Sequence, residues 1–185
     1  MSDTIFIIRH GEKPGTPIEA PGIDPVAGLF DDPDSLTAAG WERARALVNL
    51  FHPTKGAPTA GLATPTCLFA AAVDDPDSSK RPLQTILPLA LSFGPPLPVD
   101  SSIQASNITA LAAAAQSAAG VVLVAWKHEH IIEIAALLSP DAALPPKWSK
   151  DRFDVVFVFE RNTAGTYNFS QTLEHALPSD SDATL

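Results

Sequence analysis

Four side chains that suit the binding and transfer of a phosphoryl group are spread along the sequence. In chain order they are Arg9, His10, Arg81 and His128. A guanidinium suits phosphate because its planar fork donates two parallel hydrogen bonds to two oxygens. A neutral imidazole can attack phosphorus, which divides one difficult displacement into two easier ones. These residue types together indicate an anion site that contains a nucleophile.

Three short apolar runs precede these side chains and predict strands buried on both faces, as in a parallel sheet. The runs cover residues 4–8, 67–73 and 121–126. Ligands bind at the carboxyl ends of parallel strands. We therefore expect the side chains that follow the three runs to meet in one crevice.

Helical patterns separate the strands and are expected over residues 37–52, from 81 onward, 107–119 and 131–138. Pro88 is expected to kink or shorten the second helix. Residues 153–159 and 166–169 are compatible with an antiparallel hairpin at the sheet edge. The alternation predicts an α/β fold, a three-layer α/β/α sandwich with a mainly parallel sheet.

The 185 residues, 45% of them hydrophobic, predict a single domain over 1–178 and a flexible polar tail over 179–185. A net charge of −9 argues against a nucleic-acid or membrane-surface binder. Cys67 is the only cysteine, which argues against a disulfide or a cysteine zinc site. No signal peptide and no membrane span are recognisable, so a cytoplasmic location is expected.

Short motifs at the predicted element boundaries resemble those of the histidine phosphatase superfamily, which has the phosphoglycerate-mutase-like fold. Residues 9–11 read R-H-G, residues 36–40 fit L-T-x-x-G, residues 79–85 fit S-x-x-R-x-x-Q-T, and residues 121–128 form an apolar strand ending in histidine. The motifs keep the family's order across residues 4–131. Each is weak alone, but together they are fairly specific.

The resemblance implies a role for each matched residue. His10 would be the nucleophile that becomes phosphohistidine, and Arg9, Arg81 and His128 would hold the phosphoryl oxygens. It also implies catalysis without a metal or an organic cofactor. The implied activity is a phosphatase acting on a small phosphorylated substrate or a phosphoprotein, with inorganic phosphate as product.

The proton donor for the leaving group is not fixed by the motifs. The chain lacks the glycine that often follows the family's second histidine. Glu129 is the preferred donor because it directly follows His128; Asp100 is the second choice and Glu12 the third. Lys13 either lines the cleft or is an ordinary solvated loop lysine.

Two alternatives stay open: a phosphomutase that uses the same phosphohistidine, and a non-catalytic protein that binds a phosphorylated ligand. The loops expected to shape the mouth cover residues 11–34, 74–80, 100–107 and 140–150. They contain few basic residues, which favours small or weakly charged substrates over polyphosphorylated ones. The sequence predicts no oligomeric state.

Overall fold

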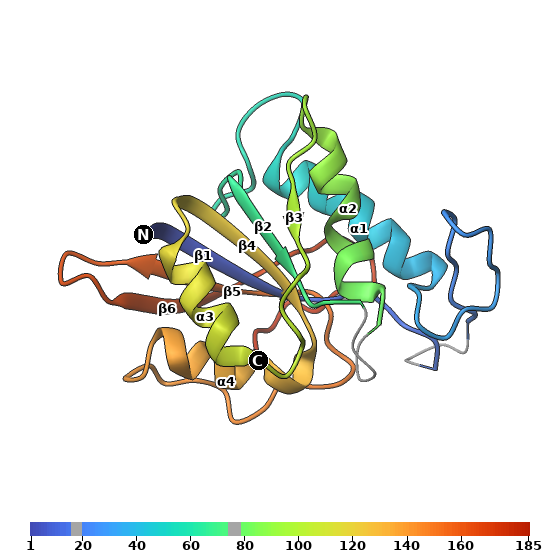
Figure 1. Cartoon of the computed structure of the whole chain (residues 1–185). Helices are drawn as coiled ribbons and strands as arrows, with labels where there is room; N and C mark the ends of the chain where they lie inside the picture. Colours follow the sequence, from blue (N-terminus) through green and yellow to red (C-terminus); the bar gives the residue numbers. More distant parts are fainter. Residues whose placement is uncertain (16–19, 74–78) are drawn as a thin grey trace.

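The computed structural model describes residues 1–15, 20–73 and 79–185, so parts of two loops expected at the mouth, residues 16–19 and 74–78, lie outside the description. A six-stranded sheet lies between two pairs of helices, which confirms the predicted α/β/α sandwich (Figure 1). In chain order the elements are β1 (Ser2–Arg9), α1 (Ala38–Phe51), β2 (Cys67–Ala70), α2 (Arg81–Ser92), β3 (Val99–Asp100), α3 (Ile108–Ser117), β4 (Gly120–Trp126), α4 (His128–Leu138), β5 (Val155–Arg161) and β6 (Tyr167–Leu173).

The strand order in the sheet is β3-β2-β4-β1-β5-β6. The four strands from β3 to β1 are parallel, whereas β5 runs antiparallel to β1 and β6 antiparallel to β5. The predicted edge hairpin is therefore confirmed. Its turn is closed by Asn162, whose side-chain oxygen accepts hydrogen bonds from the amides of Ala164 and Thr166.

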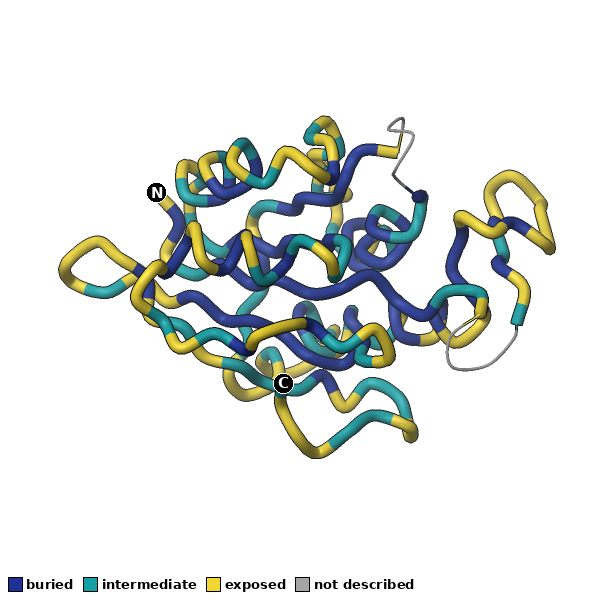
Figure 2. The backbone as a smooth tube through the Cα atoms, turned by 90° about the horizontal axis from the view of Figure 1, so that it is seen from below, coloured by how far each residue is buried: buried dark blue, intermediate teal, exposed yellow. Residues whose placement is uncertain are grey.

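Strand β1 carries side chains into both layers of the core. Ile5 and Ile7 pack in the cluster that includes α3 and α4, whereas Phe6 and Ile8 pack in the cluster that includes α1 and α2. Burial on both faces explains why the run is unbroken rather than alternating. The tube of Figure 2 is dark along these central strands. The residues directly after β1 are thus fixed at the end of a rigid element.

Several boundaries differ from those expected. Pro88 does not end α2, which continues to Ser92 while its inner residues, including Leu89, stay buried against the sheet. Tertiary packing thus outweighs the backbone hydrogen bond that a proline removes. Strand β2 stops at Ala70, three residues early. Helix α4 begins at His128 rather than at residue 131.

The C-terminal segment, expected to be flexible over residues 179–185, makes several hydrogen bonds with the domain. The amide of Ser181 donates to Asp154, and the amide of Leu185 donates to the side chain of Gln171. Its flexibility in solution stays a prediction. Within the described ranges, no helix combines the length and the apolar character needed to span a bilayer.

Candidate active site

His10 lies directly after β1 and is only 3% exposed. Its backbone amide donates to the carbonyl of Trp126, the last residue of β4. Its Nδ1 lies 2.7 Å from the carbonyl oxygen of Gly11. A carbonyl only accepts, so this contact requires a hydrogen on Nδ1 and leaves the lone pair on Nε2. Burial and the charge of Arg9 hold the pKa of His10 well below its ordinary value, which keeps the ring neutral.

Arg9, the last residue of β1, is completely buried. Its Nη1 donates to the carbonyl oxygens of Ser149, Lys150 and Arg152, at 3.2, 2.6 and 2.9 Å. Its guanidinium carbon lies 3.9 Å from the centre of the Phe153 ring. Within the described chain, Nε and Nη2 have no partner. One side of the guanidinium is therefore held by the protein, and the edge formed by Nε and Nη2 is left for an anion.

The turn after His10 is built by close contact between two glycines. A Cβ on Gly40, in the first turn of α1, would lie 2.5 Å from the carbonyl oxygen of Glu12, and a Cβ on Gly11 would lie 3.0 Å from the carbonyl of Gly40. Any side chain at either position would push the helix away from the turn. The amide of Gly11 donates to Thr85 of α2 at 2.9 Å. These contacts explain the glycines of the two motifs and the threonine that ends the third.

Arg81 is the first residue of α2, so it lies at a helix N-terminus where free amides and the helix dipole favour an anion. Its Nη1 donates to the carbonyl of Pro33 at 2.6 Å, while Nε is buried with no partner among the described residues. Burial lowers the pKa of Arg81. The charge of Arg81 also contributes to the low pKa of His10.

His128 is the first residue of α4, which presents a second helix N-terminus at the ends of the strands. Its Nδ1 lies 3.0 Å from Oε2 of Glu129. The carboxylate of Glu129 acts on the pKa values of both Arg9 and Arg81. The five residues expected at the site therefore lie at the carboxyl ends of β1 and β4 and at the N-termini of α2 and α4, and their catalytic roles stay a prediction.

The three carboxylates considered as proton donors have different surroundings. The contact with His128 lowers the pKa of Glu129, so this carboxyl group is ionised at neutral pH. Asp100 accepts hydrogen bonds from the amide and hydroxyl of Ser102 and is exposed. Glu12 is held by Arg43, with 2.7 Å between Oε1 and Nη2. Glu129 and Glu12 both act on the pKa of Arg9, and Glu129 also acts on the pKa of Arg81.

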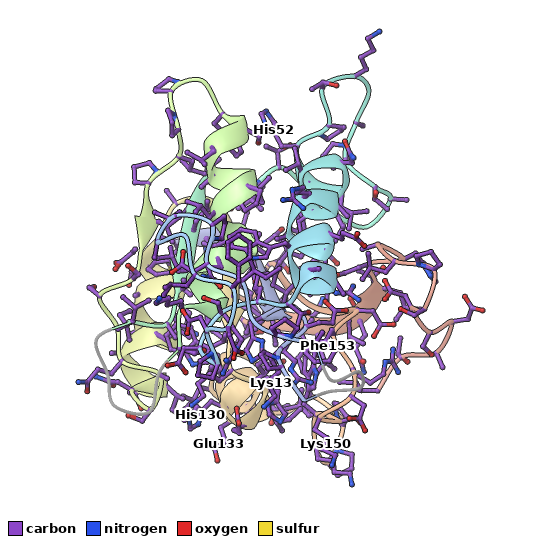
Figure 3. The ribbon with its side chains drawn as sticks, turned by 90° about the vertical axis from the view of Figure 1, so that its right-hand side faces the viewer. Lys13, His52, His130, Glu133, Lys150 and Phe153 are labelled. Atoms are coloured by element: carbon purple, nitrogen blue, oxygen red, sulfur yellow. The ribbon has the colours of Figure 1, made fainter. Side chains whose placement is uncertain are left out.

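Lys13 follows His10 by three residues and carries a further positive charge. Burial and the charges of Arg81 and Arg9 lower the pKa of Lys13. Figure 3 shows Lys13 at the same end of the molecule as Phe153, with His52 at the opposite end of the view. Lys13 is partly buried, so it is not a fully solvated loop lysine, and its place in the cleft stays a prediction.

Next to the pocket, Arg43 of α1 forms a buried ion cluster with three carboxylates. It lies within 2.8 Å of Glu12, Glu174 and Asp180, which come from distant parts of the chain. One positive charge faces three acidic groups here. Burial raises the pKa of Glu174 to about 7 despite the opposing effect of Arg43.

The raised pKa of Glu174 predicts a pH dependence of stability. Between the ordinary value of 4.5 and about 7, the native protein keeps a proton that the unfolded chain releases. The free energy of unfolding should therefore fall as pH rises through this window, by up to about 1.4 kcal/mol per pH unit. Glu174→Gln should flatten this dependence in urea titrations at pH 5, 6, 7 and 8. The exposed Glu160→Gln is the matched control, and profiles of equal slope for wild type and Glu174→Gln would contradict the assignment.

Sequence reasoning missed the groups that orient Arg9. Phe153 was expected to begin a strand, yet β5 starts at Val155 and the Phe153 ring lies beneath the guanidinium instead. The carbonyls of Ser149, Lys150 and Arg152 carry no signal in the sequence, because every residue has one. The sequence offered one indication: Arg9 directly follows the predicted strand over residues 4–8, and an arginine buried there needs hydrogen-bond acceptors.

The arrangement suits nucleophilic attack on a tetrahedral anion. A neutral imidazole presents Nε2 beside two guanidiniums with unused donors, and two helix N-termini lie at the same end of the sheet. Among residues 1–15, 20–73 and 79–185, no three histidine, cysteine or acidic side chains lie together as metal ligands.

Comparisons with known proteins give a fold. The sequence matches no protein-family model and no curated protein. Among solved structures, the chain is similar to "the protein histidine phosphatase SixA complexed with tungstate", with a TM-score of 0.57 and 14% sequence identity. The match covers 92% of this chain and 97% of that chain. The likeness that the short motifs indicated is therefore confirmed at the level of the fold: this chain shares the fold of the protein histidine phosphatase SixA.

Proposed function

We propose that this protein is a metal-independent phosphatase that forms a phosphohistidine on His10. The observation that carries the proposal is the pairing of a neutral His10, with its lone pair on Nε2, and buried guanidinium donors that lack partners in the described chain. Unpaired buried donors are costly, and an incoming phosphoryl group supplies the missing oxygens.

In the first step, Nε2 of His10 attacks phosphorus while the bond to the leaving group breaks. The leaving group departs with the electron pair, and the phosphoryl group stays on His10. Donors of Arg9, Arg81 and the N-termini of α2 and α4 stabilise the negative charge on the phosphoryl oxygens. Nδ1 keeps its hydrogen bond to Gly11 throughout, which fixes the ring for in-line attack.

In the second step, water attacks the phosphohistidine and inorganic phosphate leaves. Glu129 is ionised at neutral pH, so it suits the acceptance of a proton from this water. The same ionisation makes Glu129 a weak proton donor in the first step. Leaving groups that need no proton from Glu129, such as phenols or an imidazole whose second ring nitrogen already carries a proton, are therefore favoured over alkoxides.

The structural neighbour points the same way on substrate class. SixA is named as a protein histidine phosphatase, and its structure holds tungstate, a tetrahedral oxyanion like phosphate. We infer that the substrate of this chain is a phosphorylated molecule of this kind, a phosphoprotein or a small aryl-like phosphoester.

The test is hydrolysis of an aryl phosphate by the purified protein, with and without a chelator, combined with rapid quenching. We expect turnover that EDTA does not reduce, and a labelled enzyme that is stable in alkali but labile in acid, as a phosphohistidine is. Loss of activity with EDTA and its return with a divalent metal would contradict the mechanism. Phosphate binding without turnover on any phosphoester would favour the non-catalytic alternative.

A further inference from the structure

The loop between β1 and α1 exposes three large apolar side chains together. Val26, Leu29 and Phe30 are 85%, 48% and 77% exposed. Together we call them the apolar knob. Soluble proteins seldom expose neighbouring large apolar side chains unless the patch contacts a partner. The exposed loop projects from the end of the molecule where β1 stops (Figures 1 and 2).

The knob is held in place by polar bonds at its base. Asp24 accepts hydrogen bonds from the amides of Val26 and Ala27, and its backbone pairs with Leu29 in both directions. Lys80 lies 2.7 Å from both Asp24 and Asp32. Two ion pairs and a small bridge therefore fix a loop whose tip buries little of its own apolar surface.

The base of this loop also touches the candidate active site. The carbonyl of Pro33 accepts a hydrogen bond from Arg81, and Lys80 directly precedes Arg81. Phe30 and Pro33 are three residues apart, so their Cα atoms lie within about 11 Å of each other. The knob therefore lies within reach of a protein-sized molecule bound at Arg81.

We propose that the apolar knob docks a protein substrate, so that the phosphorylated side chain enters the pocket while Val26 and Phe30 contact the surrounding protein surface. This inference rests on the proposed phosphatase function. Exposed Asp31 and Asp34 lie beside the knob, so the complementary partner surface is apolar with a basic rim. The same carboxylates and the net charge of −9 oppose an anionic membrane.

The proposal separates protein substrates from small ones. An aryl phosphate fills the pocket without reaching the loop tip, so the knob should not affect its hydrolysis. An intact phosphoprotein gains the knob contact in addition. A few anchor residues of an interface commonly account for a tenfold or larger part of the affinity, and Phe30 is the candidate for such an anchor here.

The test compares the double variant Val26→Ser/Phe30→Ser with wild type on two probes: an aryl phosphate, and intact histones phosphorylated on histidine with phosphoramidate. We expect unchanged kcat/KM on the aryl phosphate and a rise of at least about tenfold in KM on the histones. Leu91→Ser/Leu137→Ser removes two other exposed leucines, 60% and 42% exposed in α2 and α4, and should change neither.

Each other outcome has a distinct meaning. Equal histone kinetics for wild type and the knob variant, with aryl phosphate hydrolysis intact, overturn the docking proposal alone. Absence of aryl phosphate and histone hydrolysis in wild type overturns the proposed function. Binding of wild type but not the variant to phosphatidylserine vesicles would assign the knob to membranes. A dimer in sedimentation that the variant loses would assign it to self-association.

Discussion

Replacement of His10 by alanine should lower kcat on an aryl phosphate at least about 10⁴-fold, because the variant has no group to accept the phosphoryl. Acid-labile labelling of the enzyme should vanish with it. The measurement is steady-state hydrolysis with rapid-quench labelling of both proteins. The substitution removes the side chain that hydrogen-bonds to the Gly11 carbonyl, which could affect folding. Circular dichroism and thermal unfolding therefore check that the variant is folded.

A histidine far from the pocket gives the matched control. His52 lies at the C-terminal end of α1 and stacks on Phe93, at the opposite end of the view in Figure 3. His52→Ala should keep kcat within about twofold. If His10→Ala keeps more than a tenth of wild-type kcat, the nucleophile is another group and the mechanism proposed above is wrong.

The low pKa of His10 adds a pH signature to the same prediction. In the proposed mechanism the neutral ring is the nucleophile, and burial and Arg9 hold the pKa of His10 well below 6.5. An ordinary imidazole would lose half its reactivity on acidification to pH 6.5, whereas His10 should stay neutral there. The log of kcat/KM against pH should therefore show no acid limb from His10 between pH 7 and 6.

The central sheet is the part of the fold that the sequence predicts best, because a strand buried on both faces appears in the sequence as an unbroken apolar run. The run from Ile5 to Ile8 has to be apolar throughout when one core takes the odd residues and another the even ones. The hairpin was likewise visible from its Asn162 turn. The predicted strands also showed where each strand ends, and Arg9, His10 and His128 could be chosen because they lie at those ends.

The contacts that fix the site were much less visible. Helical periodicity places Arg43 outside the apolar face of α1, yet it is buried by carboxylates that lie 31, 131 and 137 residues away. Pairing at such separations has no local pattern. The state of Glu129 similarly depends on His128 taking the first position of a helix, one turn earlier than the apolar periodicity indicated.

The second large effect is expected for Arg9→Lys, even though the positive charge is kept. Arg9 donates to three backbone carbonyls with Nη1, while Nε and Nη2 have no partner in the described chain and bind the phosphoryl group in the proposed mechanism. A single ammonium group cannot serve both sides at once. We expect kcat/KM on an aryl phosphate to fall about 10²- to 10³-fold, the effect of losing an oxyanion donor. The pKa of Arg9, lowered to about 10 by burial, still leaves the wild-type side chain charged at neutral pH.

Phe153→Leu separates the stacking contact from the carbonyl contacts, because it removes the ring beneath Arg9 and keeps its Nη1 acceptors. This variant should lose less activity than Arg9→Lys. Arg45→Lys, an exposed arginine on α1, is the matched control for the chemical change itself and should be neutral. Thermal unfolding of each variant, with and without saturating phosphate, reports how much of the guanidinium acts on the anion. If phosphate stabilises Arg9→Lys as strongly as wild type, Nε and Nη2 of Arg9 do not bind the phosphoryl group. The role of Arg9 is then only to hold the carbonyls of residues 149–152.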